Sequence, residues 1–86
     1  MIGTGLRGRE IDEGGIREAV RRAFEEKFAG DFVRDVFVGK YPEGYSVVVY
    51  VRDKEDLEAI MDVADALTDR FELEGLPVAI STRVRG

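Results

Sequence analysis

The chain has 86 residues, of which 44% are hydrophobic and 36% charged, and its formal net charge is −5. No apolar run approaches the roughly 20 residues that a membrane-spanning helix needs; histidine and cysteine are both absent, which excludes disulfides, thiolate metal sites and most arrangements for nucleophilic catalysis. We therefore expect one small soluble domain that is not an enzyme, holds no cofactor and contacts no membrane, and a cytoplasmic location because no signal-peptide pattern opens the chain.

Residues 1–13 are rich in glycine and contain few apolar anchors. Such a segment is predicted to form a flexible arm or a weak edge strand. Gly3 to Gly8 matches the pattern G-x-G-x-x-G, but no buried strand precedes it, as a dinucleotide site would require. We expect residues 14–86 to form the single α+β domain.

The first predicted helix covers residues 15–29, where apolar side chains recur at helical spacing. Gly30 is predicted to end it as a left-handed residue. Residues 32–38 and 45–51 are rich in β-branched and aromatic side chains, which predicts a hairpin joined by the six-residue loop 39–44.

The second predicted helix is capped by Asp53, and residues 78–84 alternate as a final strand. A helix between two strands implies a crossover to a parallel strand, and we expect this crossover to place the last strand beside the first. The predicted fold class is α+β, a small two-layer ferredoxin-like sandwich of order α-β-β-α-β with both helices on one face. Residues 1–13 could add a weak extra strand. The apolar stripe of the second helix is predicted to be Leu57, Ile60, Met61, Ala64, Leu67 and Phe71.

Alternation along the strands predicts one sheet face against the helices and one open face. The inward set is Val36, Val38, Val47, Val49, Val51, Val78 and Ile80. The outward set is Val33, Asp35, Phe37, Ser46, Val48, Tyr50, Arg52, Ala79, Ser81 and Arg83. An apolar patch rimmed by arginine is typical of a partner surface, unless the N-terminal arm covers it. The candidate interface, for a homodimer or a small protein partner, is therefore Phe37, Val48, Tyr50, Arg52 and Arg83.

The segment Glu43-Gly44-Tyr45-Ser46-Val47-Val48-Val49-Tyr50 resembles the RNP1 element of RNA-recognition motifs. The resemblance implies that strand aromatics stack on bases. Glu43 stands where that element has a basic residue, and the net charge is negative, so nucleic acid is the less favoured partner. The alternative function, an RNA- or anion-binding domain, would use Arg7, Arg9, Tyr45, Tyr50, Arg83 and Arg85.

Acidic residues follow helical spacing along the outer face of the second helix, and an ordinary solvated face explains them without a metal site.

The chain also lacks tryptophan, asparagine and glutamine, a depletion of thermolabile side chains that predicts a thermophilic source. The leading hypothesis is a non-enzymatic binding or regulatory module that self-associates through the open sheet face or an edge strand. The acidic residues on the outer face of the second helix, mentioned above, are Glu55, Glu58, Asp62, Asp65, Asp69 and Glu72.

Overall fold

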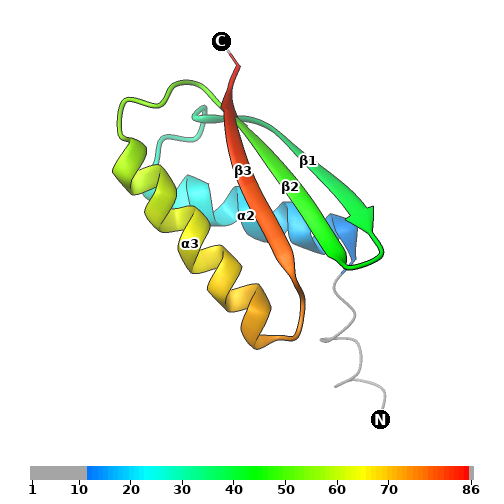
Figure 1. Cartoon of the computed structure of the whole chain (residues 1–86). Coiled ribbons are helices and arrows are strands. Elements are labelled where there is room, and N and C mark those ends of the chain that lie inside the picture. The colour runs from blue at the N-terminus through cyan, green and yellow to red at the C-terminus, as the bar shows by residue number, and fades with distance from the viewer. Residues whose placement is uncertain (1–11, 86) are drawn as a thin grey trace, which may run out of the picture.

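Two helices and a three-stranded mixed sheet make up the computed structural model, which describes residues 12–85 (Figure 1). The predicted element order α-β-β-α-β is confirmed. The predicted arm of residues 1–13 lies outside the described residues except for Asp12 and Glu13, which begin the first helix instead. The elements are α2 (Glu13–Lys27), β1 (Val33–Tyr41), β2 (Gly44–Val51), α3 (Leu57–Leu73) and β3 (Val78–Val84).

Helix α2 begins at Asp12, whose carboxylate accepts the backbone N–H of Gly15 at 2.9 Å. Its C-cap is Phe28, which has an extended backbone, so the prediction that Gly30 ends the helix was wrong. The physical reason is aromatic packing, because the Phe28 ring stacks on Phe32 with 4.2 Å between the ring centroids. Leaving the helix at Phe28 allows this stack to form.

Helix α3 begins later than expected, because Asp56 rather than Asp53 accepts the N–H of Ala59. Asp53 instead accepts the N–H of Glu55 in the preceding turn, at 3.2 Å. The buried stripe also differs from the prediction, since Val63 belongs to it while Leu57 and Met61 are exposed. The apolar face of the helix is therefore rotated relative to the predicted stripe. The buried residues of α3 are Ile60, Val63, Leu67 and Phe71.

Strand β2 lies between β1 and β3, pairing antiparallel with β1 and parallel with β3 (Figure 1). The expectation that the last strand would lie beside the first was therefore wrong, and the three strands do not have the ferredoxin-like order. A parallel neighbour needs a crossover of about a dozen residues or more, and residues 52–77 with α3 supply it. The chain thus returns directly alongside β2, from Tyr45 opposite Val78 to Val51 opposite Val84.

The hairpin between β1 and β2 is tighter than predicted, because Tyr41 already pairs with Gly44. Only Pro42 and Glu43 form the turn. At the other end of β1, the register shifts between Val33 and Asp35. This irregularity inserts one residue and turns Val33 inward, so the prediction that Val33 lies on the outward face was wrong.

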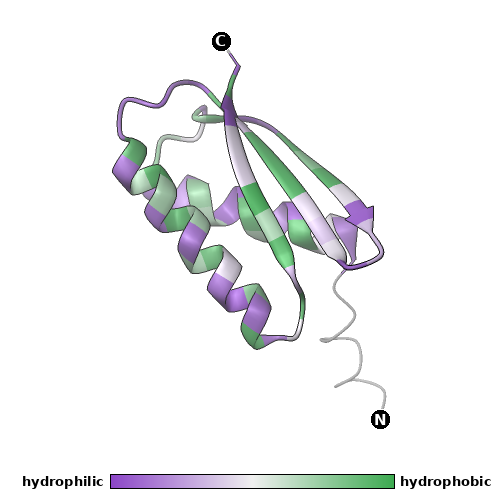
Figure 2. Cartoon of the chain, in the orientation of Figure 1, coloured by the Kyte–Doolittle hydropathy of each residue, from purple (hydrophilic) through white to green (hydrophobic). Residues whose placement is uncertain are grey.

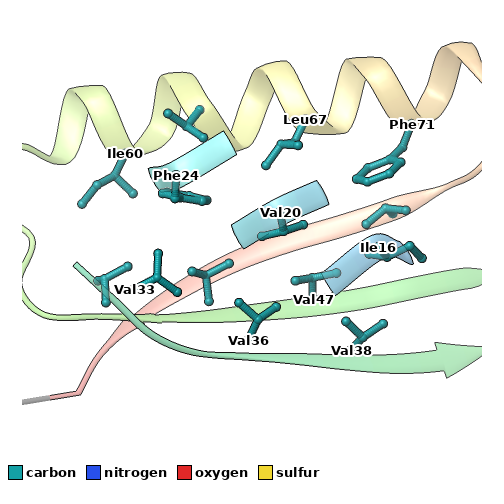
Figure 3. Close-up of a cluster of buried hydrophobic side chains, with 14 of the residues drawn as sticks. Ile16, Val20, Phe24, Val33, Val36, Val38, Val47, Ile60, Leu67 and Phe71 are labelled. Carbon is teal, nitrogen blue, oxygen red and sulfur yellow. The ribbon is translucent and has the colours of Figure 1, made fainter. Parts of the chain in front are cut away.

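One core lies between the sheet and the helices (Figure 3). The central strand supplies Val47, Val49 and Val51, which are fully buried, and no polar or charged side chain among residues 12–85 is buried. Apolar and polar residues alternate along both helices, so each presents an apolar side to this core (Figure 2). Neither described helix is long and apolar enough to cross a membrane. The helix residues in the core are Ile16, Val20, Phe24, Ile60, Val63, Leu67 and Phe71.

Candidate functional site

The sheet face opposite the core is the candidate site. Strand pairing places Phe37 beside Val48 and Val48 beside Ser81, and the neighbouring row contains Asp35, Tyr50 and Arg83. Phe37 is 55% exposed, so no described part of the chain covers its ring. We call this surface the open sheet face, and its central residues are Asp35, Phe37, Val48, Tyr50, Ser81 and Arg83.

Two exposed aromatic rings follow β1 along this face. Phe37 and Tyr41 flank Gly39, and a Cβ atom at Gly39 would lie 3.4 Å from ring carbons of both. Tyr41 is 54% exposed. On the adjacent strand, half-buried Val48 pairs with Phe37. The hairpin side of the open sheet face is therefore aromatic and apolar.

Cationic side chains gather at the other end of the open sheet face. The Arg85 guanidinium lies 5.2 Å from the centroid of the Tyr50 ring and 3.3 Å from a carboxylate oxygen of Asp35. A shallow depression of about 780 Å³ surrounds them, with three cations and one carboxylate on its wall. Its lining residues are Asp35, Phe37, Tyr50, Lys54, Thr82, Arg83, Val84 and Arg85.

Arg52, which the sequence predicts on the rim of this face, is held elsewhere. Its Nε donates to Asp53 at 2.9 Å and its Nη1 donates to Asp31 at 3.1 Å. These two carboxylates raise the pKa of Arg52 above its ordinary value. The pKa of Asp53 is lowered, first by the hydrogen bond from Arg52 and then by the one from the Glu55 N–H. Arg52 therefore joins the loops at the strand end and does not line the depression.

The structure brings together only some of the residues proposed for nucleic-acid binding. Tyr50, Arg83 and Arg85 share the depression. Tyr45 instead packs against the core in the same alternation as Val47, and Arg7 and Arg9 lie outside the described residues. The RNP1-like segment thus presents only one of its two tyrosines on the open sheet face.

On each outer strand, a charged side chain forms a hydrogen bond with a backbone group. The Asp35 carboxylate accepts the Val36 N–H at 2.8 Å on β1, and the Lys54 ammonium donates to the Thr82 carbonyl at 2.9 Å on β3. Charged groups at a sheet edge hinder the addition of another strand. The open sheet face is therefore a better candidate for contact than either edge.

The acidic residues of α3 are all exposed to solvent. Within residues 12–85, no group of three or more acidic, histidine or cysteine side chains could hold a metal ion. The sequence reasoning missed Asp35 and Arg85 as partners across the sheet. The alternation of Arg83 and Arg85 was the available signal, since residues two apart on a strand share a face.

No protein-family model matches the chain, and no curated protein matches its sequence. Its function must therefore be inferred from the chemistry of the open sheet face.

Proposed function

We propose that this protein is a non-enzymatic binding module that self-associates through the open sheet face to form a homodimer. The observation that supports it is the exposure of the Phe37 and Tyr41 rings beside half-buried Val48 and Tyr50. Contiguous apolar patches on small proteins usually mark a contact surface. Aromatic residues and arginine are also enriched at protein interfaces.

A second copy of the chain complements this face because the two ends of the face carry different chemical groups. Cations gather near Arg83 and Arg85, whereas exposed rings lie toward the hairpin at Tyr41. In a twofold dimer the same patch contacts itself. If the twofold axis runs across the strands, the cations of one copy lie over the aromatic rings of the other, and cation–π attraction favours this arrangement. An axis along the strands would place cations opposite cations.

The size of the face predicts a weak dimer. Three strands about 4.8 Å apart and roughly 25 Å long cover a patch about 15 Å wide. Such a patch falls short of the roughly 800 Å² per partner that stable complexes bury. The proposed dimer should therefore dissociate on dilution. The cytoplasmic location and the thermophilic source remain predictions from the sequence.

Sedimentation equilibrium over a concentration series tests the proposal. Phe37→Glu places a charge in the proposed contact and should leave a folded monomer at every concentration, because an unpaired buried charge is costly. Met61→Glu is the matched control, since Met61 is 54% exposed against 55% for Phe37 but lies on α3. The control should dimerise like the parent protein.

Two results would contradict the proposal. The first is a parent protein that stays monomeric at the highest concentration, which would favour cover by residues 1–11 or a different partner. The second is equal dimerisation of the Phe37 and Met61 variants, which would place the contact elsewhere.

A further inference from the structure

We propose that the depression beside Tyr50 binds a nucleoside phosphate, a small ligand that joins a phosphate group to a planar ring. Arg and Lys side chains recognise phosphate through charge-assisted hydrogen bonds, and aromatic faces stack on planar rings. The depression combines both kinds of group, since Lys54, Arg83 and Arg85 share it with Phe37 and Tyr50. A second copy on the open sheet face would cover the same residues, so this inference concerns the monomer and does not depend on self-association.

The charge of the depression favours an anion. Asp35 is the one carboxylate among its lining residues, and it is bonded to Arg85. Arg83 forms no ion pair within residues 12–85. Lys54 donates to an uncharged backbone carbonyl. Two of the three cations are therefore uncompensated, although the whole chain carries a net charge of −5.

The aromatic groups provide one free stacking surface. The Arg85 guanidinium lies over the Tyr50 ring at 5.2 Å, so that ring already has a cationic neighbour. Phe37 lines the same depression and is 55% exposed. A planar ligand ring on Phe37 would bring its phosphate within the reach of Arg83 and Lys54.

The distribution of cations favours a compact ligand over a nucleic-acid strand. A strand is bound along a groove by cations that follow its backbone. Here the cations lie at one end, and the hollow at the hairpin end, about 250 Å³, has no cationic side chain. Glu43 lines that hollow and would repel the next phosphate. The face therefore fits one nucleotide unit.

A titration of the full chain with 5′-AMP, followed by backbone amide NMR shifts in dilute protein, tests this site. Shifts should be largest at Phe37, Tyr50 and Arg83. Arg83→Gln should weaken binding about tenfold, as expected for one lost charge-assisted hydrogen bond. Arg17→Gln is the control, because Arg17 is exposed on α2 and its substitution changes the net charge by the same amount. It should leave the affinity for 5′-AMP unchanged.

Four outcomes would overturn the inference. Inorganic phosphate that binds as tightly as 5′-AMP would show that no ring is recognised. A single-stranded oligonucleotide that binds far more tightly than 5′-AMP would assign the face to a strand. Equal weakening by the Arg83 and Arg17 variants, or no shifts at millimolar 5′-AMP, would remove the site. Because the protein is kept dilute, a failure of self-association leaves this titration unaffected.

Discussion

Gly44 and Pro77 are in backbone contact, because a Cβ atom at Gly44 would lie 2.3 Å from the Pro77 carbonyl oxygen. The same carbonyl accepts the Tyr45 N–H at 2.9 Å, so the start of β2 is fixed against the segment that leads into β3. Gly44 also has φ of 150°, a backbone conformation that other residues rarely adopt. Glycine at this position therefore permits the close approach of hairpin and β3.

Gly44→Ala should lower the free energy of unfolding by about 1–3 kcal/mol, because the methyl group clashes with backbone and strains φ. Gly30→Ala is the control, since nothing lies within 4 Å of the Cβ position there and its φ is not in the left-handed region. That control should be neutral or stabilising by up to about 1 kcal/mol. Urea unfolding of both variants measures the difference, and equal stabilities would show that the Gly44 contact is unimportant.

Phe24→Ala should remove about 3–5 kcal/mol of stability, because Phe24 is fully buried between α2 and the sheet. So large a loss is comparable to the whole stability of a small domain. Far-UV circular dichroism should then show an unfolded or partly folded chain at room temperature. Leu73→Ala is the control because Leu73 is 89% exposed; a similar loss there would contradict the described core.

Asp12→Ala should destabilise the protein by about 1 kcal/mol, because it removes the carboxylate that accepts the Gly15 N–H. Asp12→Asn keeps an oxygen that can cap the helix and should cost only a few tenths of a kcal/mol. Thermal unfolding of the two variants separates capping from charge. An equal loss in both would indicate that the charge at the helix start is what matters.

Stability should fall in acid partly through Asp53. Its pKa is lowered in the folded protein by Arg52 and then by the Glu55 N–H, so the folded state binds its proton more weakly than the unfolded state. The contribution is present above the ordinary aspartate pKa and is lost below about pH 4, as the pH falls through the lowered value. Urea titrations at pH 7 and pH 3 should show a smaller difference for Asp53→Asn. An unchanged difference would mean that the Arg52 contact adds nothing.

Residue patterns within short segments predicted the helices and strands well. They could not predict contacts between residues that are distant in the sequence. Residues 78–84 form β3 as expected because alternation is a property of neighbouring residues. The strand order was wrong because alternation does not encode which strands become neighbours. Arg52 was misplaced because its partner Asp31 is 21 residues away in the sequence. Val33 was misplaced because an irregularity in the register reverses the alternation.

The parallel pairing of β2 with β3 also sets the order in which the protein can be completed. The contact from the Ser81 hydroxyl to the Val47 carbonyl joins residues 34 apart, and closing such a loop costs chain entropy before any contact repays it. During synthesis the hairpin and α2 can assemble first, but one side of β2 remains without its partner until β3 has been made. We expect the sheet to close late, so that one side of β2 stays unpaired from the completion of β2 at Val51 until β3, Val78–Val84, has been made.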